Sequence, residues 1–183
     1  MTCIIGYKDE KGIYIGGDSA DIEGLDLIIR EDPKVFERGR FVFGCTVSWR
    51  MIQILMHTNF GALVQDDDQT DFEFLCNDFI DFIKFRFNQK GFEFEPAEDY
   101  IRGAFILGYK NNLYVIKENY EIAIAQLPFV SVGCGFRYAL GAMAAMRVQD
   151  SSTMIKKVLD IVSTLSAGVQ GPFNIIHVPE ERK

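Results

Sequence analysis

Apolar and polar positions alternate over short intervals in the first third of the chain, and turn residues interrupt them. The segments CIIGY and GIYIGGD are separated by KDEKG, a polar stretch that ends in Gly12. Alternation bounded in this way predicts two strands joined as a β-hairpin. Three more short strands are predicted in LDLIIR, DPKVFE and RFVFGCTV, at 25–30, 32–37 and 40–47.

The period changes to that of a helix at Ser48. Apolar side chains then recur three or four residues apart, at Trp49, Ile52, Leu55, Met56 and Phe60. This spacing places them on one face of a helix, and serine readily accepts hydrogen bonds from the first N–H groups of a helix. We therefore predict a helix that begins after Ser48.

A second helix is predicted over 71–90, after the acidic linker QDDDQT. Thr70 and Glu73 have the spacing of a capping box. One broad side of this helix carries Phe72, Leu75, Cys76, Phe79, Phe82 and Ile83, and other directions carry Phe74, Phe85 and Phe87. A helix that is apolar on more than one face is buried on more than one face. This predicts either a thick core or a contact between subunits.

The second half of the chain repeats the order of strands followed by helices. Strands are predicted at 102–110, 112–117, 121–126 and 129–133, helices at 136–148 and, after Asp150, at 151–165, and a last strand at 173–178. Two antiparallel sheets between two pairs of helices satisfy this order. We therefore predict an α+β fold of one domain, residues 1–183, in four αββα layers. No GxGxxG follows a strand, so a dinucleotide-binding fold is not expected.

Composition excludes several classes of protein. The chain has 183 residues, of which 48% are hydrophobic and 25% charged, so a sizeable core is expected. The net charge is −7 and no cluster of lysine and arginine occurs, so no nucleic-acid partner is expected. Apolar runs are far shorter than the roughly 20 residues that span a bilayer, so no membrane segment is predicted. No basic and apolar leader opens the chain, so we expect no secretory signal at Met1.

The cysteines do not indicate a metal site. Cys3, Cys45, Cys76 and Cys134 are scattered without a CxxC pair, and the chain has only two histidines. We expect no metal and no cofactor, and buried reduced thiols in a cytoplasmic protein.

Thr2 is the first candidate for chemistry, although most threonines at position 2 have no function. If Met1 is removed, the hydroxyl of Thr2 lies beside its own α-amine, which can act as a general base near neutral pH. Such a nucleophile needs a nearby cation, an anion that holds this cation, and N–H groups that face the oxyanion. Asp18 follows the second predicted strand, Lys34 lies at the start of a later one, and the predicted helix near Ser48 begins with unpaired N–H groups.

This pattern resembles the proteasome β-subunit family of N-terminal nucleophile hydrolases, and in length it is most similar to the HslV-type peptidases. The separations from Thr2 to Asp18 and to Lys34 match those of the family without a gap. FVSVGCGFRYALGAM is similar to the family's strand-to-helix step, and IKKVLDIVS with FNIIHV is similar to its last helix and strand. The resemblance covers nearly the whole chain. It implies that Thr2 is the nucleophile, Lys34 the cation that tunes it, and Asp18 the carboxylate that orients the lysine.

Other positions depart from the family's pattern. Cys134 stands where the family has a serine that hydrogen-bonds near the N-terminus, and a thiol is a weaker donor and acceptor. Ser48 stands about where the family has the glycine whose N–H binds the oxyanion. The family's acidic residue near the last turn has no counterpart, because Thr164 and Ser166 lie in that region.

The resemblance implies a threonine peptidase that cleaves polypeptides inside a homo-oligomeric ring, with an ATPase unfoldase as a possible partner. The apolar helix at 70–90 and the small-residue helix at 136–148 would then supply contact faces. Two other hypotheses stay open: a non-catalytic subunit that forms rings or docks onto a partner, and an amidase that acts on small molecules. A nucleophile at Cys3 would need two residues removed, which shifts Asp18 and Lys34 out of register.

Overall fold

The computed structural model describes residues 1–46, 48–94, 105–146 and 150–180, and its strands form two larger sheets and one hairpin. The first sheet has the order β10-β1-β2-β11, with all neighbours antiparallel. Its strands are β1 (Cys3–Asp9), β2 (Gly12–Gly17), β10 (Phe129–Gly133) and β11 (Asn174–Pro179). The second sheet is antiparallel in the order β5-β6-β7-β8-β9. Its strands are β5 (Val35–Arg38), β6 (Phe41–Cys45), β7 (Phe105–Tyr109), β8 (Asn112–Ile116) and β9 (Ile122–Ile124).

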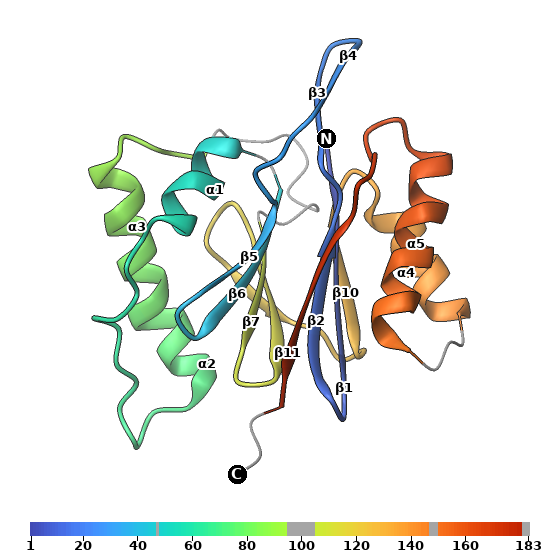
Figure 1. Cartoon of the computed structure of the whole chain (residues 1–183). Coiled ribbons are helices and arrows are strands. Elements are labelled where there is room, and N and C mark those ends of the chain that lie inside the picture. The colour runs from blue at the N-terminus through green and yellow to red at the C-terminus, as the bar shows by residue number, and fades with distance from the viewer. Residues whose placement is uncertain (47, 95–104, 147–149, 181–183) are drawn as a thin grey trace.

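Helices lie on the outer sides of the two sheets, which face each other (Figure 1). The β5–β9 sheet is covered by α1 (Trp49–Met56), α2 (Asp71–Phe74), the π-helical turn η1 (Leu75–Phe79) and α3 (Ile80–Gln89). The other sheet is covered by α4 (Phe136–Ala145) and α5 (Ser151–Leu165). Among the described residues, no helix is long and apolar enough to cross a membrane.

The core between the sheets brings β1 and β2 close to β6. Ile4 and Ile15 are fully buried there. Gly44 of β6 lies opposite them, and a Cβ at this position would be 2.5 Å from a methyl carbon of Ile4 and 2.6 Å from one of Ile15. Only glycine permits this approach. The close packing fixes the N-terminal strand against the centre of the molecule.

Most predicted elements are confirmed, and local capping explains why their starts are right. Ser48 caps α1 by accepting hydrogen bonds from the N–H groups of Arg50 and Met51. Thr70 forms the predicted capping box with Glu73. Each cap satisfies N–H groups that have no partner within the helix. The predicted positions 47, 102–104, 147 and 148 lie outside the described residues.

The prediction missed one strand of an exposed hairpin. The segment 25–30 does contain a strand, β4 (Asp26–Ile29), but its partner β3 (Ala20–Glu23) was not predicted. β3 is short and half polar, so it gives little periodicity. The hairpin extends away from both sheets (Figure 1), and Leu25 at its turn is fully exposed.

The segment predicted as a helix over 71–90 is helical from Asp71 to Gln89, but a π-helical turn interrupts its α-helical geometry. The π-helical turn η1 inserts an extra residue per turn, which rotates the faces on either side of it relative to one another. Of the three phenylalanines placed off the main apolar side, Phe74 and Phe87 are buried and Phe85 is exposed, and Phe72 of the main side is exposed as well. Most of the apolar width of this segment thus packs into a thick core.

Candidate active site

Thr2 lies at the start of β1 and is almost fully buried. The next residue, Cys3, pairs with Gly133 of β10. Gly133 has φ +93°, and a Cβ there would be 2.3 Å from the carbonyl oxygen of Thr2. Glycine is thus required both by the left-handed backbone and by the close approach of the Thr2 backbone.

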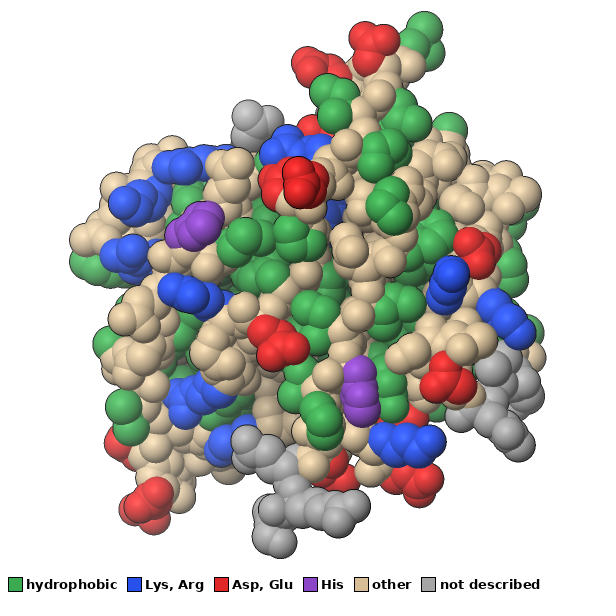
Figure 2. Space-filling view, in the orientation of Figure 1, with side chains coloured by type: hydrophobic (Ala, Val, Ile, Leu, Met, Phe, Trp, Pro, Cys, Tyr) green, Lys and Arg blue, Asp and Glu red, His purple; other side chains and the backbone are tan. Residues whose placement is uncertain are grey.

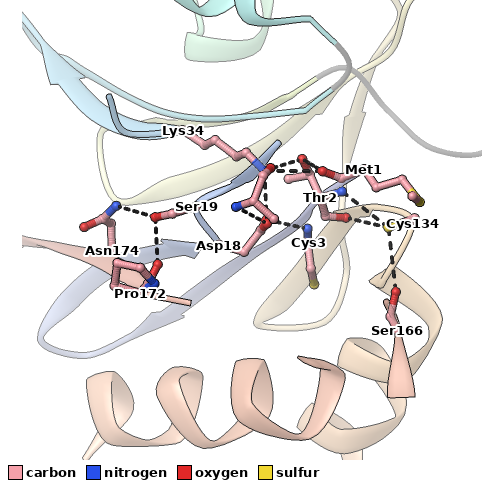
Figure 3. A network of polar contacts seen from close by, with 11 residues as sticks. Met1, Thr2, Cys3, Asp18, Ser19, Lys34, Cys134, Ser166, Pro172 and Asn174 are labelled. Atoms are coloured by element: carbon pink, nitrogen blue, oxygen red, sulfur yellow. Dashed lines mark hydrogen bonds and ion pairs between the residues drawn. The ribbon is translucent and has the colours of Figure 1, made fainter. Parts of the chain in front are cut away.

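Lys34 directs its ammonium group at the Thr2 hydroxyl (Figure 3). The residue immediately precedes β5, and its side chain is only 3% exposed. Nζ lies 2.8 Å from Thr2 Oγ1 and 3.0 Å from Asp18 Oδ2, and it also donates to the carbonyl of Ala20. The carbonyl oxygen of Met1 is a fourth acceptor, so the cation is held by four groups, one of which is the candidate nucleophile.

Asp18 follows β2 and is fully buried. Its Oδ1 accepts the N–H of Cys3 at 2.9 Å, and its Oδ2 accepts the N–H of Ala20 at 3.0 Å. The carboxylate thus fixes the backbone beside Thr2 as well as Lys34. The three residues for which the sequence predicts a shared site are brought together by β1, β2 and the segment before β5.

Burial is the main electrostatic influence on this ion pair. It lowers the pKa of Lys34 and raises the pKa of Asp18, because removal from water disfavours each charged form. The charge of the partner opposes the shift in both cases. A lysine with a lowered pKa gives up its proton more readily than a solvated one, which suits a group beside a nucleophile.

Met1 occupies the position next to the hydroxyl. Thr2 Oγ1 donates to the carbonyl oxygen of Met1, and Lys34 Nζ lies 3.3 Å from the same oxygen. While Met1 is attached, the nitrogen of Thr2 is a peptide amide and cannot act as a base. A free α-amine at this position requires removal of Met1.

Cys134 contacts the backbone of Thr2 on the other side. The N–H of Thr2 donates to its Sγ at 3.3 Å, and Sγ in turn lies 3.3 Å from the carbonyl oxygen of Thr2. The hydroxyl of Ser166 lies 3.8 Å from the same sulfur. Of the two residues in the region where the family has an acid, Ser166 therefore lies beside the candidate site. The hydroxyl of Thr164 instead donates to the carbonyl of Asp160 on α5.

Ser48 has a different contact from the one that the resemblance implies. Its N–H donates to the carbonyl of Thr46 at 2.7 Å, and its hydroxyl caps α1. In this conformation the Ser48 N–H is engaged within its own loop. The expected oxyanion donor is thus near the start of α1 but not free.

A charged cluster beside the site is not predicted from the sequence. The guanidinium of Arg30 stacks over the Trp49 ring at 3.9 Å and forms ion pairs with Asp21 and Asp32. Lys34 Nζ lies 5.5 Å from the centre of the same ring. The sequence pattern places Trp49 only on the apolar face of the helix, and nothing in the sequence indicates its contact with Arg30.

The thiols give no support to the cysteine alternative. Cys3 is fully buried, and burial raises the pKa of its thiol to about 12. A protonated buried thiol is a poor nucleophile. Among the described residues, no group of three or more metal-ligating side chains exists.

Comparisons with known proteins agree with this arrangement at the level of the fold. No family model matches the chain, and no curated protein sequence matches it. Solved structures of proteasome-type proteins do match. Thiobacillus denitrificans BPH in complex with epoxomicin has a TM-score of 0.75 at 15% identity, over 98% of this chain and 100% of that one. Eukaryotic HslV from Trypanosoma brucei has a TM-score of 0.64 at 12% identity, over 95% and 97%.

Anbu is a third solved structure that this chain resembles. The Gly-1 mutant of Anbu from Hyphomicrobium sp. strain MC1 has a TM-score of 0.66 at 15% identity, over 98% of this chain and 82% of that one. The chain therefore has the proteasome-type fold of mixed helices and antiparallel sheets, and the predicted resemblance is confirmed in this respect.

Proposed function

We propose that the chain is a threonine peptidase subunit whose nucleophile is Thr2 after removal of Met1. One observation carries the proposal: a buried lysine lies 2.8 Å from the hydroxyl of the residue that would become N-terminal, and a buried carboxylate holds that lysine. A purely structural threonine has no need of a buried ion pair, which is costly to desolvate.

The proposed reaction uses the three residues together. The Thr2 hydroxyl attacks the carbonyl carbon of a peptide, and its proton moves to the Thr2 α-amine. Lys34 stabilises the developing alkoxide, and Asp18 keeps the ammonium in place. The tetrahedral intermediate collapses as the C–N bond breaks, and the departing amine takes the proton. Water then attacks the resulting ester and regenerates Thr2.

The oxyanion needs N–H donors that face it. We propose that the Ser48 N–H takes this role when substrate displaces it from the Thr46 carbonyl. Cys134 is proposed to position the Thr2 nitrogen through the contact at 3.3 Å.

The wider assignment is also part of the proposal. The chain is taken as one N-terminal nucleophile domain with four αββα layers. It is proposed to act on polypeptides within a homo-oligomeric ring in the cytoplasm. An ATPase unfoldase as a partner is implied by the resemblance alone. The exposed Phe72 and Phe85 on the helical layer suit a contact between subunits.

The test is cleavage of a fluorogenic peptide and of unfolded casein by protein from which Met1 has been removed. Thr2→Ala should abolish cleavage and leave assembly unchanged. Thr153→Ala is the matched control, because Thr153 is an exposed threonine on α5. Cleavage that survives in Thr2→Ala would overturn the mechanism.

A non-catalytic subunit of the same fold is the second candidate. Two observations favour it: the hydroxyl of Thr2 is bonded to the carbonyl oxygen of the attached Met1, and the Ser48 N–H is already bonded to Thr46. This candidate predicts that wild-type protein and Thr2→Ala behave alike in both cleavage assays and assemble alike.

A further inference from the structure

A cavity of about 380 Å³ lies between α1 and α3, on the outer side of the helical layer that covers the β5–β9 sheet. Its described lining residues are Arg50, Gln53, Ile54, His57, Thr58, Arg86 and Lys90. None of them belongs to the candidate active site. The volume falls within the range of small-molecule sites, roughly 300–1,000 Å³.

Apart from Thr58, the lining residues come from α1, α3 and their caps, where helical spacing places them on shared faces. Arg50, Gln53, Ile54 and His57 are three or four residues apart and so share one face of α1 and its cap. Arg86 and Lys90 are four residues apart at the end of α3. Cations at a helix C-terminus are favoured by the helix dipole, but this accounts only for the α3 pair and not for Arg50.

The charge of the lining is one-sided. Arg50, Arg86 and Lys90 carry three positive charges, His57 adds an imidazole, and no described lining residue is acidic. The chain as a whole has a net charge of −7, so a group of cations on it is unusual. Figure 2 shows blue Lys and Arg side chains around a purple His on the left of this face, over the α1 and α3 layer.

The polar groups of Thr58 in the cavity lining have hydrogen-bond partners, whereas one donor of Arg86 has none among the described residues. Thr58 is buried, its hydroxyl donates to the carbonyl of Ile54, and its own carbonyl accepts from Arg38 Nε. In the wall, Arg86 Nη1 donates to Gln89 Oε1 at 2.9 Å. Its Nε is buried and has no hydrogen-bond partner among the described residues. A buried donor without a partner costs free energy, so an acceptor that reached this Nε would be stabilising.

We propose that this cavity binds a small molecule through phosphate groups that carry two or more negative charges. Guanidinium groups match the geometry of phosphate oxygens, and lysine adds a point charge. Three cations exceed what one carboxylate would neutralise, whereas a phosphate group has a charge of about −1.5 to −2 at neutral pH. The site accepts a phosphorylated metabolite or an inorganic polyphosphate by the same chemistry.

The test is isothermal titration calorimetry of the full chain with orthophosphate, inorganic diphosphate and citrate at physiological ionic strength. Diphosphate should bind at one site per chain and more tightly than orthophosphate or citrate. In the variant Arg86→Gln/Lys90→Gln the affinity for diphosphate should fall at least tenfold. Arg50→Gln/Lys90→Gln provides a second variant that keeps Arg86 and its contact with Gln89.

The matched control is Lys156→Gln/Lys157→Gln, which removes two exposed lysines from α5 on the opposite layer. It loses the same charge and should bind diphosphate as the wild type does. Equal weakening in both pairs would show general attraction of anions and overturn the proposal. Absence of binding, or citrate binding as tight as that of diphosphate, would also overturn it. Nucleotide and polyphosphate titrations then distinguish a metabolite from a polymer.

Discussion

The ammonium nitrogen of Lys34 lies 2.8 Å from the hydroxyl oxygen of Thr2, although 32 positions separate the two residues in sequence. The contact exists because β1 and the segment before β5 meet beside the end of β2, where Asp18 accepts both from Lys34 and from the backbone of Cys3. One buried carboxylate therefore determines the position of the cation and of the strand that carries the candidate nucleophile.

We expect Asp18→Asn to destabilise the fold by about 3–5 kcal/mol, because it leaves the buried Lys34 cation without its counter-charge. Asp18→Asn/Lys34→Met should lose less stability than Asp18→Asn alone, since it buries no charge. The measurement is urea unfolding of both variants. Asp160→Asn, at an exposed aspartate on α5, should change stability by less than about 0.5 kcal/mol. If Asp18→Asn changed the free energy of unfolding as little as Asp160→Asn, the buried ion pair would not be important for stability.

The pair also predicts how stability depends on pH. Burial lowers the pKa of Lys34 below its ordinary 10.5, so between the folded value and 10.5 the unfolded chain binds more protons. The contribution of Lys34 to the free energy of unfolding therefore rises with pH in that window. Burial raises the pKa of Asp18 above its ordinary 3.8, so between 3.8 and the folded value the folded chain binds more protons. The contribution of Asp18 therefore falls as pH rises there.

These slopes are measured by urea unfolding over a pH series. The curve for Asp18→Asn/Lys34→Met is subtracted from that of the wild type. The difference should slope downwards with pH on the acid side and upwards on the alkaline side. A difference that is flat across both windows would show that burial does not shift either pKa.

Gly133 should tolerate no side chain. Gly133→Ala would place a Cβ 2.3 Å from the Thr2 carbonyl oxygen and would strain a residue with φ +93°. We expect a loss of more than about 1 kcal/mol of stability and a displaced nucleophile. Gly141→Ala on α4 is the control, because a Cβ there meets nothing within 4 Å. It should be neutral or stabilising by up to about 1 kcal/mol. Thermal unfolding of both variants checks the prediction.

Substitutions of Cys134 test whether its contact with the Thr2 nitrogen contributes to the reaction. Cys134→Ser supplies a stronger donor and acceptor in place of the thiol and should retain or increase the rate of reaction at Thr2. Cys134→Ala removes the contact and should lower that rate by about 2–10-fold, the equivalent of one hydrogen bond. Rates of peptide cleavage by the two variants decide this. Equal rates in both variants would show that position 134 only fills space.

Local features explain what the sequence could predict of the fold. Asp150 and the apolar period after it set α5 at 151–165, as the structure has it, because a cap and a helical stripe are both encoded within a few residues. The π-helical turn at 75–79 was not predictable in this way, since it depends on how the phenylalanines pack against the sheet. The strand at 20–23 was missed because its partner, not its own pattern, makes it a strand.

The same distinction holds for the candidate site. Thr2, Asp18 and Lys34 were predicted because a resemblance carries side-chain types and their spacing. The carbonyls of Met1 and Ala20 were not, because backbone groups have no identity in the sequence. The bond from Ser48 to Thr46 depends on the local backbone conformation. Ser166 was noted only as the replacement for a missing acid, and its distance to Cys134 is a result of the fold.

We infer that Thr2, once Met1 is removed, is a competent N-terminal nucleophile. The most direct measurement is the intact mass of the native protein with and without epoxomicin, a peptide epoxyketone that reacts with both the hydroxyl and the free amine of an N-terminal threonine. We expect a chain without Met1 and one covalent adduct per chain, with no adduct on Thr2→Ala. A chain without Met1 that forms no adduct would contradict the claim and leave the proteasome-type fold as a structural subunit.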